Sequence, residues 1–119
     1  MTDYKPKFRP GNAVTFTADA DVTGGRVVEV SGDREVRTSA ADSAKAFGIA
    51  GFDVKAGESV TVFVGGIQRP TAGGVIAAGD RVTTNAAGKV VTLGSGTNPI
   101  GLALQAATAD GDVIDVLFN

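Results

Sequence analysis

The chain has 119 residues with a net charge of −2, is rich in glycine, and contains neither cysteine nor histidine. These counts exclude disulfides, thiol and imidazole catalysis and nearly every transition-metal site, and the charge argues against a nucleic-acid-coating protein. Because no apolar run approaches the roughly 20 residues that span a bilayer, we expect no membrane contact, and we also expect no cofactor and no metal.

The first twelve residues differ in character from the remainder of the chain. Residues 4–10 (YKPKFRP) alternate bases with prolines and aromatic residues, a pattern that forms no helix. Two interpretations stay open: a disordered terminus, as at most chain ends, or an extended N-terminal arm over residues 1–12 that binds another chain. In the second interpretation, the aromatic residues anchor the arm and its cations bind an acidic partner. The predicted contact residues are Tyr4, Lys5, Lys7, Phe8 and Arg9.

The chain from residue 13 to residue 119 is predicted to form a single β-domain. Alternating apolar residues predict strands at residues 14–16 and 27–30 and a further short strand from Val36, with glycine-containing turns between them. Residues 39–46 (SAADSAKA) are the only stretch with helix propensity, and we interpret them as a loop with a short turn.

Two segments of the chain share one pattern. Residues 47–50 (FGIA) precede a turn at Gly57-Glu58, and residues 100–103 (IGLA) precede a turn at Gly111-Asp112. Each turn leads into alternating branched apolar residues, which is typical of a half-buried strand leaving a tight turn. The pattern predicts two similar strand–turn–strand units. We expect burial of Ile49, Leu102, Val60, Val62, Ile114 and Val116.

The segment between the two units also reads as strands and turns. Pro70 predicts an edge strand or a strand end, and Gly79-Asp80 resembles a third, weaker Gly-acid turn before a strand. Residues 86–89 predict a hairpin turn, and residues 94–99 predict a loop. Short strands at this spacing favour an all-β fold, a small glycine-rich β-barrel or β-sandwich.

Motifs that could carry chemistry are incomplete. Asp19 and Asp21 imitate the start of a calcium loop, but the twelfth position, which needs a bidentate carboxylate, is Val30. Residues 54–58 resemble the hairpin of biotin- and lipoyl-carrier domains, but Lys55 lacks their flanking motif. We expect paired carboxylates on a glycine turn to stabilise the turn and not to act in acid–base catalysis. We predict no catalytic residues and no enzyme activity.

The order of these elements resembles the capsid cement or decoration proteins of tailed bacteriophages. The resemblance rests on residues 13–30 (AVTFTADADVTGGRVVEV), the FGIA unit with residues 56–58 (AGE), residues 65–67 (GGI), residues 78–82 (AGDRV) and the IGLA unit with Gly111-Asp112. Each piece is common, and their order is more specific.

The resemblance implies a non-enzymatic protein on the outside of an icosahedral phage head, made in the host cytoplasm. It implies binding to the major capsid protein as a homotrimer at three-fold positions, which stabilises contacts between capsid subunits. The alternative is a free-standing β-module that binds carbohydrate or another ligand. Sugars usually stack on exposed Trp or Tyr, and this chain has no Trp and one Tyr.

Overall fold

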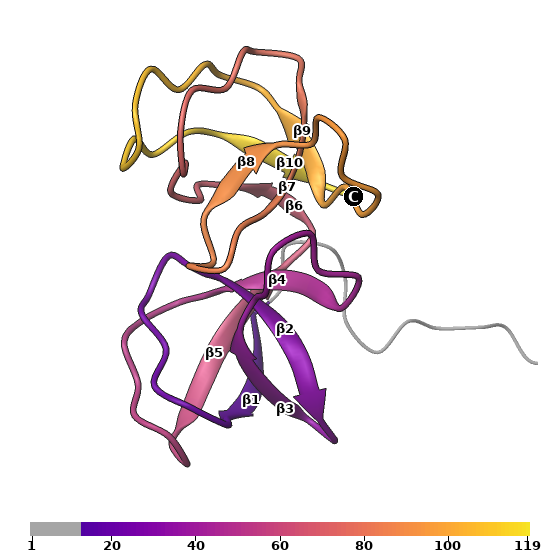
Figure 1. Cartoon of the computed structure of the whole chain (residues 1–119). Coiled ribbons are helices and arrows are strands. Elements are labelled where there is room, and N and C mark those ends of the chain that lie inside the picture. The colour runs from indigo at the N-terminus through magenta and orange to yellow at the C-terminus, as the bar shows by residue number, and fades with distance from the viewer. Residues whose placement is uncertain (1–12) are drawn as a thin grey trace, which may run out of the picture.

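A computed structural model describes residues 13–119, which form short β-strands joined by turns (Figure 1). Within this range no helix is long and apolar enough to cross a membrane. The predicted all-β fold is confirmed. Residues 39–46 form turns and no helix, as predicted. The strands are β1 (Ala13–Ala18), β2 (Val27–Gly32), β3 (Glu35–Thr38), β4 (Ala46–Ala50), β5 (Ser59–Val64), β6 (Gly66–Gln68), β7 (Arg81–Thr84), β8 (Val90–Thr92), β9 (Gly101–Ala103) and β10 (Val116–Phe118).

Strands β1 to β5 form a closed barrel, which we call repeat 1. Its strand order is β1-β3-β2-β4-β5, and the antiparallel pairing of β5 with β1 closes the ring. Side chains along β5 alternate between the inside and the outside of the barrel. Val60 and Val62 are fully buried, whereas Thr61 is half-buried and Phe63 is exposed. Closure leaves this barrel with a core of its own, formed mainly by valines.

Strands β6 to β10 form a second sheet, repeat 2, with the same pairing scheme as repeat 1. Its order β6-β10-β9-β7-β8 matches β1-β5-β4-β2-β3 strand for strand. The parallel pairing of β1 with β3 is reduced here to one bridge between Ala72 and Val90. Strand β6 lies at an edge of the sheet, which confirms the prediction for the segment before Pro70.

Matching hydrogen bonds show that the duplication covers the whole described chain. The Gly57 N–H donates to Ala18 O at 2.8 Å, and the Gly111 N–H donates to Ala72 O at 2.8 Å. Both glycines have positive φ, 88° and 98°, as such turns require. The predicted pair of strand–turn–strand units is therefore the second half of a longer repeat.

The turn at Gly79-Asp80 has a different counterpart from the one that its sequence suggests. The Gly79 N–H donates to Ala103 O, and the Gly25 N–H donates to Ala50 O, both at 2.8 Å. Gly79 thus corresponds to Gly25 in the turn before β2, and not to the two Gly-acid turns.

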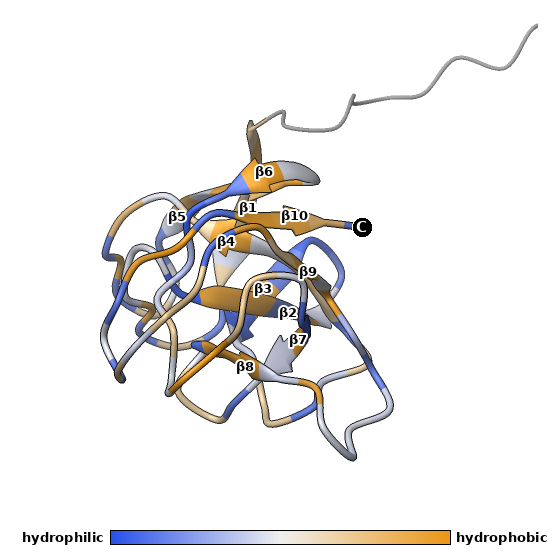
Figure 2. Cartoon of the chain, turned by 90° about the horizontal axis from the view of Figure 1, so that it is seen from above, coloured by the Kyte–Doolittle hydropathy of each residue, from blue (hydrophilic) through white to orange (hydrophobic). Residues whose placement is uncertain are grey.

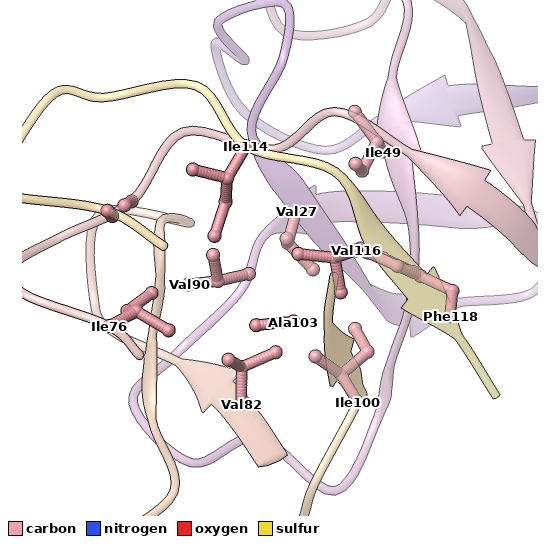
Figure 3. Packing of buried hydrophobic residues seen from close by; sticks show 12 residues of the cluster. Val27, Ile49, Ile76, Val82, Val90, Ile100, Ala103, Ile114, Val116 and Phe118 are labelled. Carbon is pink, nitrogen blue, oxygen red and sulfur yellow. The ribbon is translucent and has the colours of Figure 1, made fainter. Parts of the chain in front are cut away.

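The two repeats share one hydrophobic cluster. Val27 and Ile49 of repeat 1 point away from their own barrel and pack among the core residues of repeat 2, near Val116 (Figure 3). Both are buried, with exposed fractions of 0% and 6%. Repeat 2, which is not a closed barrel, therefore completes its core with side chains from repeat 1.

The burial predictions are correct except at one position. Ile49, Val60, Val62, Ile114 and Val116 are buried. Leu102 is only half-buried, because the inward positions of β9 are Gly101 and Ala103. In β4, likewise, the inward residues are Gly48 and Ala50. Ile49 faces outward and is buried because repeat 2 covers it.

Candidate functional site

The predicted contact residues Tyr4, Lys5, Lys7, Phe8 and Arg9 lie outside the described residues. The described chain starts at Ala13, which pairs with Phe63 of β5. A shallow hollow of about 270 Å³ lies near this end of β5, where the two repeats meet. Its lining is mainly apolar: Ala46, Phe47, Gly65, Pro99, Ile100, Phe118 and Asn119.

A second hollow, of about 320 Å³, lies at the opposite end of repeat 1 and carries three carboxylates. Each carboxylate accepts a backbone hydrogen bond: Asp21 from Ala56, Asp53 from Gly24 and Glu58 from Lys55, at 2.7–2.9 Å. The Ala56 N–H and the nearby Lys55 ammonium lower the pKa of Asp21 below its ordinary value. These carboxylates hold turns together, which fits a structural role better than acid–base catalysis.

The calcium-loop interpretation of Asp19 and Asp21 gains no support. The Asp21 carboxylate is paired with the Lys55 ammonium at 3.6 Å, in addition to its bond from Ala56. Among residues 13–119, no group of three His, Cys, Asp or Glu side chains is placed to hold a metal ion.

The corresponding end of repeat 2 is less acidic, because only one of the three carboxylates, Glu58, has an acidic counterpart, Asp112. Val75 occupies the place of Asp21, and Ala106 the place of Asp53, in the bridge between Ile76 and Ala107 that matches the bridge between Val22 and Val54. Val75 is 74% exposed. Hence the two repeats present surfaces of different chemistry on the same backbone path.

A buried carboxylate organises the loop between β3 and β4. The side chain of Glu29 is only 4% exposed and accepts hydrogen bonds from Arg37 Nε, the Ala40 N–H and Ser43 Oγ, at 2.6–2.9 Å. Burial raises the pKa of Glu29, but the bonds from Ala40, Ser43 and Arg37 outweigh it and hold the pKa below its ordinary value. The loop is thereby fixed over β2.

Asp42, in the same loop, links the two repeats. Its carboxylate accepts hydrogen bonds from the N–H groups of Thr97 and Asn98, and these bonds lower the pKa of Asp42. Its own N–H donates to Thr84 O at 2.8 Å. Its backbone has a positive φ of 48°, a conformation that Asp tolerates better than most residues.

An apolar row crosses the outer face of repeat 2. Ile67 on β6 pairs with Leu117 on β10, which pairs in turn with Leu102 on β9. Ile67 is 61% exposed, and β10 is hydrophobic along its length (Figure 2). Sequence reasoning missed this face. The alternation in residues 113–118 was a usable signal, because outward Leu117 stands where a solvated strand would carry a polar residue.

The fold and these surfaces define an all-β protein with two shallow hollows and an exposed apolar row on the outer face of repeat 2. The model of the phage cement protein family matches residues 8–118, and the chain belongs to that family. It is thus a phage structural protein associated with the capsid, which confirms the resemblance predicted from its sequence.

A solved structure shares the fold. The chain is similar to the head fiber gp8.5 N base of bacteriophage phi29, with a TM-score of 0.75 and 23% sequence identity, over 91% of this chain and 93% of the other. No curated protein matches the chain.

Proposed function

We propose that this chain is a non-enzymatic cement protein that binds the outside of an icosahedral phage head. The family match over residues 8–118 carries the proposal. In this role it contacts the major capsid protein and stabilises the contacts between neighbouring capsid subunits. It is made in the host cytoplasm and ends up on the virion.

The described surface supports this role physically. Ten strands and a buried loop network give a fixed scaffold, and its outer face carries the neighbouring apolar side chains of Ile67, Leu117 and Leu102. Contiguous exposed apolar surface on a soluble protein usually marks a partner site. On a repeating lattice, an oligomer engages several sites at once, so weak single contacts suffice.

A homotrimer at three-fold positions of the head is part of the proposal. Strand β6 ends its sheet with Ile67 exposed, and association covers such an edge. Closed symmetric oligomers are the usual way in which identical chains associate.

The N-terminal arm is proposed as a further contact. Residues 1–12 carry three cations and one carboxylate, so they are basic, whereas residues 13–119 carry a net charge of −4 within the total of −2. A basic arm therefore suits an acidic partner surface, on the capsid or on a sister copy. Aromatic residues such as Tyr4 and Phe8 concentrate binding energy at interfaces.

The test is co-sedimentation with heads that were assembled without this chain. We expect the full chain to pellet with the heads and to saturate. Deleting residues 2–10 should leave the fold intact, because β1 begins at Ala13, and should weaken attachment. Heads that fail to bind the full chain would contradict the function, whereas full-strength binding of the truncated chain would contradict only the role of the arm.

A further inference from the structure

The contact between the two repeats is one-sided. Repeat 1 contributes its outer face, with Val27 and Ile49 buried in the cluster of repeat 2. Repeat 2 contributes the turn between β7 and β8, where Gly88 O accepts a hydrogen bond from the Val27 N–H at 2.7 Å. It also contributes Ile100 and Phe118, which are nearly fully buried.

Among residues 13–119, the face of repeat 2 that corresponds to this outer face is more exposed. By strand pairing, Leu102 corresponds to Ile49, because each pairs with the matching residue of the neighbouring strand, Leu117 or Phe63. Ile49 is buried, whereas Leu102 is half-buried. Arg81, the counterpart of Val27, is exposed.

In the described part of the chain, the surface of repeat 1 that corresponds to the receiving side is also more exposed. Phe47 and Val64 correspond to Ile100 and Phe118; they pack against the cluster of their own barrel and are half-buried. Val30 corresponds to Thr84, which is 2% exposed beneath the Asp42 loop, yet Val30 is 43% exposed. One chain thus carries both halves of a second contact, one on each repeat.

We propose that copies of this chain join head to tail, the outer face of repeat 2 of one copy packing on the corresponding side of repeat 1 of the next. Because repeat 1 is a closed barrel with its own cluster, this contact lies on the barrel surface and does not fill an open core as it does within the chain. The occupant of each uncovered surface is a second copy. The interface within the chain serves as the template for the interface between chains.

Charge supports this pairing. A Cβ added at Gly88 would lie 3.0 Å from Cβ of Arg26, so these two positions are neighbours in the contact within the chain. Their counterparts are Arg34 and Asp80, which bear opposite charges and would lie together between copies. Within the chain Arg34 donates to Thr15 O, and Asp80 accepts from the Ala77 N–H and from Thr92 Oγ1, so the pair would add to these bonds. Arg81 in place of Val27 makes the face less apolar, in keeping with the enrichment of arginine at interfaces between separately folded chains.

A head-to-tail contact leads to a closed ring or to an open filament. That a ring would contain three copies rests on the homotrimer of the proposed function. The head-to-tail contact does not depend on that number. Each copy in a ring uses both of its surfaces, whereas a two-fold symmetric dimer would use one surface on both copies.

The test uses light scattering to measure the mass of the full-length protein and of two surface variants. Leu102→Asp places a charge on the outer face of repeat 2, and Val30→Asp places one on the receiving side of repeat 1. Arg81→Glu, at an exposed position, is a second face variant in case Leu102→Asp does not fold. Val75→Asp is the matched control, because repeat 1 carries Asp21 at the corresponding place.

We expect the wild-type protein and Val75→Asp to form one oligomer, and each interface variant to have the mass of a single chain. An equimolar mixture of the face variant and the Val30→Asp variant should give a 1:1 dimer, since one intact contact remains between them. A monomeric wild-type protein, unchanged oligomers in the variants, or folded variants that do not dimerise on mixing would overturn the proposal. A monomer that still binds heads would leave the cement function standing, and an oligomer that does not bind heads would leave the contact standing.

Discussion

One glycine stands at the same place in each repeat and allows two strands to approach closely. A Cβ on Gly48 would lie 2.7 Å from Phe63 O and 2.7 Å from Val62 Cγ1. On Gly101 it would meet Leu117 O and lie 2.9 Å from Val116 Cγ1. These contacts explain why both FGIA-like motifs contain glycine at this position: the inward space beside it is already filled.

Gly101→Ala should therefore lower the free energy of unfolding by about 1–3 kcal/mol, because overpacking displaces Val116 or the β10 backbone. Gly74→Ala is the control, since no atom lies within 4 Å of its added Cβ. Urea unfolding of both variants measures the difference. Equal stability of the two variants would show that β9 and β10 separate without cost.

Side-chain direction was predictable where alternation is regular. Val60, Val62, Ile114 and Val116 follow the period of two and are buried as predicted. Leu102 was assigned wrongly because the true inward residues, Gly101 and Ala103, are too small to show as a hydrophobic position. The contact residues of the arm stay a prediction.

The loop between β3 and β4 determines how the two repeats are joined. Asp42 reaches Thr97 and Asn98 in the loop before β9, and Thr84 Oγ1 donates to Ala40 O at 2.8 Å. The folded state holds the pKa of Asp42 below its ordinary value of 3.8. Its contribution to stability is therefore complete above the unfolded pKa and is lost as the pH falls through the lower, folded pKa.

Asp42→Asn should lower the melting temperature at pH 7, because an amide is uncharged and has only one acceptor oxygen for these hydrogen bonds. The difference from wild type should shrink as the pH falls below about 4, where the wild-type carboxylate also loses its charge. Melting curves between pH 7 and pH 3 test this, with exposed Asp33→Asn as the control. A difference that stays constant over this range would rule out the carboxylate as its source.

The strands were predictable from the sequence, whereas this loop contact was not. Glycine turns and alternation are local signals, and they located β1, β2, β7 and the two repeated units. Asp42 and its partners Thr97 and Asn98 lie far apart in the chain, so nothing local indicates that they meet.

The two repeats depend on each other unequally for their stability. Repeat 1 is a closed barrel with its own cluster, whereas the cluster of repeat 2 includes Val27 and Ile49 from repeat 1. Stability in small domains rises with the buried fraction of the surface, so losing two buried side chains weakens repeat 2.

A fragment of residues 13–65 should consequently retain more β-structure than a fragment of residues 66–119. Circular dichroism and proton–nitrogen correlation spectra of the two fragments measure this, with the full chain as the reference. Dispersed spectra from residues 66–119 alone would contradict the dependence of repeat 2 on repeat 1.

The full duplication was only half visible in the sequence. Residues around Gly48 and Gly101 match because a close strand approach requires glycine in both repeats. Elsewhere the backbone path is kept while the side chains differ, as Asp21 and Val75 do, so the first halves of the repeats share little sequence beyond positions such as Gly25 and Gly79. The family resemblance succeeded because it used the order of all these turns together.

The role of this chain as a capsid cement can be measured on DNA-filled heads that lack it. Purified protein is added, and the temperature at which the heads release their DNA is followed with a DNA-binding dye. We expect the release temperature to rise with added protein and to level off when the head surface is saturated. A release temperature that stays unchanged while the protein is bound, or the absence of binding, would contradict this role.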